Sequence, residues 1–304
     1  MEVLTSLFTI LVIVLLGITS RRLGVFKAEH AKTISSFVYY FGLPALFFTK
    51  ISNLDLLTLD PLFVLGTLLP TICILALLLG LFALKILNKD TFILLGLSIS
   101  FGSYAFFGVA FFETFRDGKW LDLSILAASL LGIVGIIITL SLLEFATHQE
   151  QRGGFLGKIF SNPLILSILL GAICSLLGLR LDFLYNAFSL VGQTASALAI
   201  FVLGIFIYDR FSWKTLIAAL PYSLFRMIVL PLMTGITIWL FLPISGDVTQ
   251  FLMLENGMPA AIALVVFAER YNYRITETAG VVSLTSMLSF ASLTAIYYLT
   301  ELVF

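Results

Sequence analysis

The sequence has few charged side chains for its length. Of its 304 residues, 11% are Asp, Glu, Lys or Arg, against roughly 25% in a typical soluble domain. Hydrophobic residues make up 60% of the chain, and the formal net charge is zero. Such a chain offers no basic surface, so we predict no nucleic acid partner. The composition is typical of a protein that crosses the membrane several times, with short polar loops between apolar segments.

Cysteine and histidine are also scarce. The two cysteines, Cys73 and Cys174, lie in apolar segments, and their number and spacing indicate neither a disulfide framework nor a metal site. The two histidines, His30 and His148, lie in expected loops. The chain has no H-E-x-x-H motif and no paired aspartates in its apolar segments. These absences argue against an intramembrane enzyme, and we predict no metal and no cofactor.

Long apolar runs fill most of the chain. The first follows an acidic residue, lacks a small-residue cleavage site and ends at Arg21 and Arg22, so we expect a spanning helix and not a signal peptide. A spanning helix needs about 20 mostly apolar residues. We therefore predict ten transmembrane helices, over residues 3–20, 32–51, 61–84, 91–112, 121–147, 162–180, 183–207, 214–242, 249–268 and 278–303.

The basic residues indicate which loops face the cytoplasm. Twelve of the 17 Lys and Arg residues lie in one set of alternate loops, the set that begins with residues 21–31. Four lie in the opposite set, and Arg226 lies inside an expected span. Basic residues favour cytoplasmic loops. We therefore predict a multi-pass protein of the cytoplasmic (plasma) membrane, with both termini on the non-cytoplasmic side.

A weak internal repeat relates the two halves of the chain. The stretch Leu15 to Phe26, LLGITSRRLGVF, aligns with Leu169 to Arg180, LLGAICSLLGLR, at an offset of 154 residues. Each half then holds five expected spans, and an odd number of spans forces the second copy to insert in the opposite orientation. The predicted domains are a first five-helix repeat over 1–147, a cytoplasmic connecting loop over 148–161 and a second five-helix repeat over 162–304.

The ninth expected span, residues 249–268, contains residues that disfavour a continuous helix. Pro259 lacks a backbone donor and obstructs the preceding turn, and Gly257 lowers the cost of unwinding beside it. Freed backbone groups in lipid need partners within the protein, and Glu255 and Asn256 can supply them. We predict two half-helices that meet near the middle of the bilayer, with helix ends suited to binding an anion.

The corresponding position in the first half is the fourth expected span, around the sequence from Ser98 to Glu113. It contains Gly102, Ser103 and Tyr104 but no proline. Two interrupted segments in equivalent positions are the best sequence indication of a transport site. The alternative interpretation is an ordinary proline kink whose polar neighbours bond to one another.

Two charged residues, Glu255 and Arg226, lie away from the ends of the expected spans. An ionisable group inside a bilayer is costly and is by default a functional hypothesis, so we predict Glu255 as the site of a coupling ion. The alternative for Glu255 is that its side chain reaches the interface by snorkelling. For Arg226 we expect snorkelling or a structural role.

Four stretches of the sequence form a pattern shared with a known family. They are FVYYFGLPALFF in the second expected span, FFGVAFFETF in the fourth, NPLILSILLG at the start of the sixth and GMPAAIALVVFAERYN in the ninth. Together they resemble the auxin efflux carrier family of membrane transport proteins. The similarity covers nearly the whole chain, and the short central loop resembles that of the bacterial members.

The resemblance implies a specific architecture and mechanism. The broken fourth and ninth helices would cross each other, helices 1, 2, 6 and 7 would form a scaffold, and helices 3–5 and 8–10 would form a moving transport unit. This is an elevator-like form of alternating access. Substrates of the family are organic anions such as carboxylates, and coupling to H+, coupling to Na+ and uniport all stay open. We also expect membrane lipids around the chain and a homodimer formed through the scaffold helices.

The sequence departs from the family pattern at several positions. Ser103 and Ala110 stand where the fourth helix of the family usually has Asn and Pro, and Tyr40 stands where the second often has Asn. Ala260 and Ala263 replace Thr and Asn after the proline of the ninth helix. Amide groups that bind a carboxylate are therefore scarce, so a less polar or a cationic substrate also stays open.

The sequence thus predicts an all-α membrane protein of ten transmembrane helices, arranged as two inverted five-helix repeats with broken, crossing helices 4 and 9. Its predicted function is secondary transport of a small organic solute, with an organic anion as the leading class. The alternative is a membrane sensor or receptor that has the same fold without transport. The predicted substrate-binding residues are Tyr40, Ser103, Tyr104, Asn256, Gly257, Met258 and Pro259.

Overall fold

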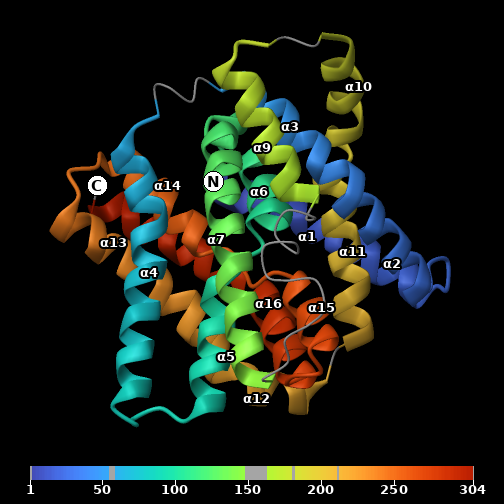
Figure 1. The fold of residues 1–304 in the computed structure, drawn as a ribbon. Coiled ribbons are helices and arrows are strands. Elements are labelled where there is room, and N and C mark those ends of the chain that lie inside the picture. Colours follow the sequence, from blue (N-terminus) through green and yellow to red (C-terminus); the bar gives the residue numbers. More distant parts are fainter. Residues whose placement is uncertain (1, 55–58, 148–162, 180–181, 211, 304) are drawn as a thin grey trace. The chain divides into compact units, whose positions relative to one another are not determined.

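The structure is a computed structural model that describes residues 2–54, 59–147, 163–179, 182–210 and 212–303. All regular structure in these ranges is helical, and strand-like pairing is limited to one isolated bridge between Gly102 and Ala260. The predicted connecting loop 148–161 lies outside the described residues. The arrangement of the helices can be followed along the chain in Figure 1.

Seven helical stretches in the described part of the chain are long and apolar enough to cross a membrane. They are Leu4–Arg22, Ala28–Asn53, Pro61–Ala83, Leu121–Thr147, Leu184–Asp209, Trp213–Phe241 and Ile275–Val303. Of the other three predicted spans, one corresponds to a shorter apolar helix, Pro163–Leu176, and two are interrupted. The chain is therefore an all-helical, multi-pass membrane protein, and the arrangement of ten helices in an inverted repeat stays a prediction.

The chain divides into two compact units, each built from segments of both sequence halves. Unit 1 comprises Met1–Leu59, Ala105–Ser129 and Arg152–Asp209, and unit 2 comprises Asp60–Tyr104, Leu130–Gln151 and Arg210–Phe304. Two elements run from one unit into the other, the π-helical turn η3 (Tyr104–Gly108) and α7 (Leu121–Thr147).

Unit 1 is built from α-helices that pack through small residues. Its elements are α1 (Glu2–Arg22), α2 (Ala28–Phe37), the π-helical turn η1 (Val38–Gly42), α3 (Leu43–Asn53), α6 (Val109–Thr114), the 3-10 turn η4 (Phe115–Gly118), α9 (Pro163–Leu176), α10 (Asp182–Gln193) and α11 (Ala195–Arg210). α3 packs against α9 and α10, and α1 packs against α6. Gly17 of α1 lies against Gly204 of α11 without room for a side chain, a close approach typical of membrane helices.

Two helices of unit 1 end in the same way, 154 residues apart. After α1, Gly24 has a φ of 74° and Val25 N–H donates to Ser20 O (3.0 Å). After α9, Gly178 has a φ of 62° and Leu179 N–H donates to the carbonyl of Cys174 (2.9 Å). Both are glycine-terminated ends in which the left-handed residue turns the chain back onto its last carbonyls. The two glycines are those aligned in the sequence repeat.

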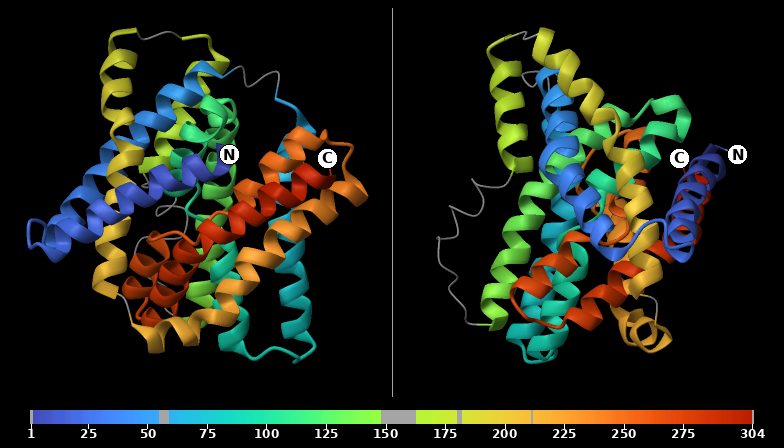
Figure 2. Two further views of the ribbon diagram at one scale, coloured as in Figure 1. Left: turned by 180° about the vertical axis from the view of Figure 1, so that it is seen from behind. Right: turned by 90° about the vertical axis from the view of Figure 1, so that its right-hand side faces the viewer.

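Unit 2 contains the two interrupted helices and the helices packed around them. Its elements are α4 (Pro61–Ala83), α5 (Lys89–Ser100), α12 (Trp213–Leu224), the π-helical turn η5 (Phe225–Val229), α13 (Leu230–Phe241), α14 (Gly246–Asn256), α15 (Ala263–Arg270) and α16 (Ile275–Val303). α12 packs along α16, and α13 contacts both α4 and α14. The view from behind in Figure 2 shows the red α16 alongside the orange stretch of α12 and α13.

The π-helical turn η5 has a local cause in the sequence. Pro231 has no N–H to donate, and its ring obstructs the carbonyl of residue 227 one turn earlier. A wider π-helical turn relieves this obstruction, and such turns occur often at functional sites. Arg226 lies within η5 and is fully buried.

Candidate functional site

The first interruption follows α5. Phe101 leaves the helix in an extended conformation, with φ −132° and ψ 98°, and helical structure resumes at Tyr104 in η3. Gly102 in between is required by close packing, since a Cβ there would overlap the guanidinium of Arg226 and the ring of Tyr104. The break leaves carbonyl groups in the last turn of α5 without helical partners.

The second interruption separates α14 from α15. α14 ends at Asn256, and Gly257 still donates its N–H to Met253 O at 3.0 Å. Pro259 has no N–H, so the helical hydrogen-bond pattern cannot continue through it. The chain resumes helical structure only at Ala263. The interruptions predicted in the fourth and ninth spans are thus both present.

The two unwound segments bond to each other. Ser103 N–H donates to Pro259 O at 2.7 Å, and Ala261 N–H donates to Phe101 O at 3.0 Å. These two bonds form the antiparallel bridge centred on Gly102 and Ala260. Backbone groups freed in the membrane need partners within the protein, and here each segment supplies them to the other. We call this meeting point, residues 101–103 and 257–262, the crossover.

Two side chains from neighbouring helices complete the crossover. Thr285 of α16 accepts a hydrogen bond from Ala260 N–H at 3.0 Å. Arg226 of η5 donates from Nε to Met258 O (2.9 Å) and from Nη1 to Ser98 O (2.5 Å). Its Nη2 donates to the hydroxyl of Tyr104 at 3.4 Å. Arg226 therefore holds both interrupted helices at once and satisfies carbonyls that the breaks set free.

This position excludes snorkelling for Arg226 and agrees with the other expectation, a structural role. Its side chain is 0% exposed, and its hydrogen-bond partners belong to the crossover, to the adjacent last turn of α5 and to the start of η3. The positive charge of Arg226 also lies next to the carboxyl end of α5, where the negative end of the helix dipole stabilises it. The signal that could have identified Arg226 was present in the sequence, because an arginine inside an apolar span is itself a functional hypothesis.

The predicted residues of the ninth span lie where α14 ends. Glu255 and Asn256 are both 0% exposed, which excludes snorkelling for Glu255. Asn256 Nδ2 donates to Leu252 O at 3.2 Å, while its Oδ1 is buried without a hydrogen-bond partner among the described residues. Met258 is buried, and Gly257 lies against Leu293 and Ile296 of α16.

The remaining predicted residues divide between the two units. Ser103 and Tyr104 are buried in unit 2, at the first interruption. Tyr40 belongs to unit 1, is 57% exposed and packs edge-on against Tyr39 with ring centroids 5.1 Å apart. The structure thus brings the predicted residues of the fourth and ninth spans together, and a role for Tyr40 in the same site stays a prediction.

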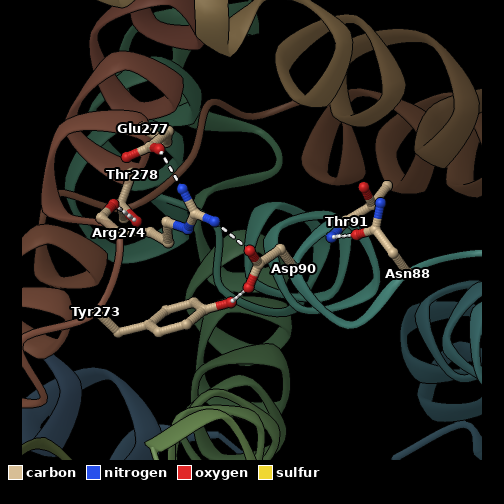
Figure 3. A network of polar contacts seen from close by, with 7 residues as sticks. All are labelled: Asn88, Asp90, Thr91, Tyr273, Arg274, Glu277 and Thr278. Atoms are coloured by element: carbon tan, nitrogen blue, oxygen red, sulfur yellow. Dashed lines mark hydrogen bonds and ion pairs between the residues drawn. The ribbon is translucent and has the colours of Figure 1, made fainter.

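A second polar cluster of unit 2 joins the start of α5 to the turn between α15 and α16 (Figure 3). Asp90 forms an ion pair with Arg274 and accepts a hydrogen bond from the Tyr273 hydroxyl at 2.9 Å. Arg274 also pairs with Glu277 at 3.1 Å. The hydrogen bond from Tyr273, followed by the one from Arg274, lowers the pKa of Asp90. Burial and the bond to Asp90 raise the pKa of Tyr273, so the tyrosine stays protonated.

Comparison with protein families gives a match along almost the whole chain. Residues 2–297 match the family described as membrane transport protein. The chain belongs to this family. The resemblance inferred from the four sequence stretches is confirmed by this match.

One relative of this membrane transport protein is found in Methanocaldococcus jannaschii. It is the uncharacterized transporter MJ1031, and it is 25% identical over 294 residues, covering 92% of this chain and 93% of the relative. The family assignment and the apolar helices together support a transport protein that spans the membrane several times.

Proposed function

We propose that this chain is a secondary transporter that carries a small organic anion across the cytoplasmic membrane, with its binding site at the crossover. Membership of the membrane transport protein family supports transport in general. The observation that carries the proposal is the pairing of two unwound segments around a fully buried arginine. A fixed positive charge among backbone dipoles favours a solute with a carboxylate group.

The proposed substrate contacts follow from the groups available at the crossover. Arg226 uses one hydrogen bond each from Nε, Nη1 and Nη2, and a guanidinium has five N–H donors in all. The buried Oδ1 of Asn256 can accept a hydrogen bond from a hydroxyl or a protonated group of the solute. Ser103 and Tyr104 add hydroxyl groups, and the backbone at Gly257, Met258 and Pro259 forms the adjoining wall.

We assign the coupling ion to Glu255. The carboxyl group of Glu255 is fully buried at the end of α14, beside the crossover, and a negative charge on it would repel an anion bound there. Its protonation state therefore depends on whether the crossover also holds an anion. This dependence would link the movement of a proton to the movement of the solute.

The inverted repeat is part of the same proposal. The matched glycine ends of α1 and α9 support it, and so do two close helix contacts. Gly17 of α1 packs against the backbone of Phe201 in α11, and Gly171 of α9 packs against the backbone of Phe48 in α3. With the offset of 154 residues, α1 corresponds to α9 and α3 to the first part of α11. Each contact is thus the counterpart of the other.

We further propose elevator-like alternating access in which the moving body carries the crossover. The breaks, Arg226, Glu255 and Asn256 all belong to unit 2. A moving body that carries the binding site would have to contain all of them. The position of both termini on the non-cytoplasmic side, and a homodimer formed through helices 1, 2, 6 and 7, belong to the proposal as well.

Reconstitution tests the proposed function. Purified protein in liposomes would be supplied with labelled mono- and dicarboxylates, and uptake would be compared with that of amino acids and organic cations. Uptake of a carboxylate that is reduced at least tenfold in Arg226→Ala supports the proposal. Absence of flux for every carboxylate, with cation flux instead, contradicts it.

The alternative function is a sensor with the same fold. The observation that favours it is the presence of alanine at positions 260 and 263, directly beside the break, where side-chain hydrogen bonds to a solute are lost. A carboxylate that raises the melting temperature of the protein but does not enter the liposomes would establish the sensor.

A further inference from the structure

The crossover offers two backbone carbonyls to a positive charge. Ser98 O lies in the last turn of α5, where the helix break removes its normal partner, and Met258 O lies just beyond the end of α14. In transporters with interrupted helices, carbonyls of unwound segments and the carboxyl ends of half-helices commonly coordinate the coupling Na+. Carbonyl oxygens are also the ligands that hard cations prefer.

In this protein the guanidinium of Arg226 already binds both carbonyls. The Nε–Met258 O distance is 2.9 Å and the Nη1–Ser98 O distance is 2.5 Å. The same guanidinium carbon lies 5.7 Å from the ring centroid of Tyr104, whose hydroxyl is a third oxygen partner. Three oxygen atoms from two interrupted helices therefore converge on one permanent cation, because an arginine does not lose its proton in a protein.

We infer that Arg226 is a tethered cation that takes the place of a sodium ion at the crossover, so that the protein works without sodium there. The consequence for coupling rests on the proposed transport function, whereas the occupancy of the carbonyls by Arg226 does not. Sodium and the Arg226 guanidinium would not share these oxygens, because two positive charges bound to the same buried atoms repel each other strongly where water is excluded. Of the options that the sequence left open, this excludes sodium at the crossover and leaves proton coupling or uniport.

The position of the guanidinium is set by rigid elements. Arg226 projects from η5, the π-helical turn that Pro231 induces, and a Cβ at Gly102 would overlap its Nη2. A planar guanidinium can bind several acceptors in fixed directions, whereas the compact ammonium of a lysine is a point charge. The oxygen acceptors are therefore arranged for the planar guanidinium of an arginine and not for the compact ammonium of a lysine.

Removal of the guanidinium should create a sodium site. Arg226→Ala leaves Ser98 O, Met258 O and the Tyr104 hydroxyl without their cation and opens the space that it filled. The Oδ1 of Asn256, buried two residues before Met258, is a further oxygen without a hydrogen-bond partner in the described chain. A small dehydrated cation can bind such a set, and a larger one fits less well.

The test is thermal unfolding of the purified full-length protein, without substrate, in NaCl, KCl and choline chloride at equal ionic strength. The wild-type protein should melt at the same temperature in all three salts. Arg226→Ala should melt lower in KCl and choline chloride and recover by at least about 3 °C in NaCl, because a ligand that binds only the folded state stabilises it. Arg226→Lys, which keeps a cation, should show no preference for sodium.

Arg274→Ala serves as the control, because it removes an arginine and its ion pairs with Asp90 and Glu277 in a part of unit 2 away from the crossover. It should lose stability equally in the three salts. A sodium-specific rise in the wild-type melting temperature would overturn the inference, as would an Arg226→Ala protein that does not distinguish the salts. An Arg226→Ala protein that cannot be recovered folded even in NaCl would also contradict it. None of these results depends on uptake, so a failure of the transport proposal would be recognised separately.

Discussion

Arg226, Glu255 and Asn256 are fully buried in unit 2, although residues of these types rarely leave the surface of a protein. Burial of a charged or amide group is costly unless the protein or a ligand provides partners. Arg226 has such partners in two carbonyls and a hydroxyl, and these come from the interrupted helices. At the scale of single residues, these three buried polar groups thus lie beside the points where the helical backbone is broken.

Replacement of Glu255 by Gln tests the proton role. Gln keeps the shape of the side chain but cannot change its charge, so any pH dependence of carboxylate uptake should disappear in Glu255→Gln. The measurement is initial uptake in liposomes between about pH 5 and pH 8, the range in which folded proteins are usually most stable. Glu113→Gln, at an exposed position of α6, is the control and should keep the wild-type profile. Equal pH profiles for wild type and Glu255→Gln would contradict the role.

Replacement of Asn256 by Ala should separate stability from function. The Oδ1 of this buried amide has no hydrogen-bond partner among the residues that the structure describes. Such a group costs the unliganded protein roughly 1–3 kcal/mol, so its removal should leave the melting temperature unchanged or slightly raised. Uptake or substrate-induced stabilisation should nevertheless fall at least tenfold.

Asn53→Ala is the matched control for this prediction. Asn53 makes the same bond to the carbonyl four residues earlier, from Nδ2 to Thr49 O at 2.9 Å, but belongs to unit 1. It should not affect uptake. A clear loss of stability in Asn256→Ala, without a change in uptake, would indicate a purely structural amide.

At the scale of elements, two helices of unit 2 are each too short to span a membrane, and helical structure resumes only after a break in the chain. α5 has 12 residues and α14 has 11, and each ends at the crossover. Their free ends are satisfied by the opposite segment, by Thr285 and by Arg226. The interruption is therefore a designed feature of the packing and not a local loss of order.

Gly102 is the residue at which this packing is tightest. Gly102→Ala should destabilise the protein by about 1–3 kcal/mol, because the added methyl group overlaps Arg226 and Tyr104. Gly132→Ala in α7 meets no neighbouring atom and should stabilise its helix by about 0.5–1 kcal/mol. Melting temperatures of the two variants in the same detergent provide the measurement. A Gly102→Ala protein as stable as Gly132→Ala would mean that the crossover is not closely packed.

At the scale of the whole molecule, each unit is assembled from segments of both sequence halves. In unit 2 the start of α5 is held to the turn after α15 by the cluster of Asp90, Tyr273 and Arg274. The same two interrupted helices also meet at the crossover. The two interrupted helices of unit 2 thus contact each other at two separate places, as expected for a body that moves as one piece.

The cluster predicts an acid dependence of unit 2. Because the pKa of Asp90 is lowered from its ordinary value of 3.8 in the folded protein, its stabilising contribution is present above that value and is lost as the pH falls through the lowered one. Asp90→Asn should remove this part of the acid sensitivity. The effect should stay below about 1 kcal/mol because the pair is partly exposed.

Thermal unfolding of the two proteins between neutral pH and about pH 3 checks this prediction. The control is Asp117→Asn, at an exposed position of unit 1, which should keep the wild-type acid dependence. Parallel stability curves for wild type and Asp90→Asn would show that the ion pair contributes nothing to folding.

The sequence by itself determined the class of the protein and the places where its helices break. Apolar runs of membrane length can be read from composition, and proline and glycine disrupt helices through local backbone effects, as at Gly257 and Pro259. The sequence repeat also aligned Gly24 with Gly178, and both glycines adopt the left-handed conformation at a helix end.

Only the tertiary structure decided which groups meet at the breaks. Arg226 lies 32 residues from Met258 and 128 from Ser98 along the chain, so no local pattern relates it to either carbonyl. Thr285 likewise reaches Ala260 only because α16 packs beside the crossover. Periodicity and propensity describe neighbours in sequence, whereas hydrogen-bond partners of an unwound backbone are chosen by the packing of distant helices. That is why the break could be predicted from local residues, whereas the carbonyls that Arg226 binds there could not.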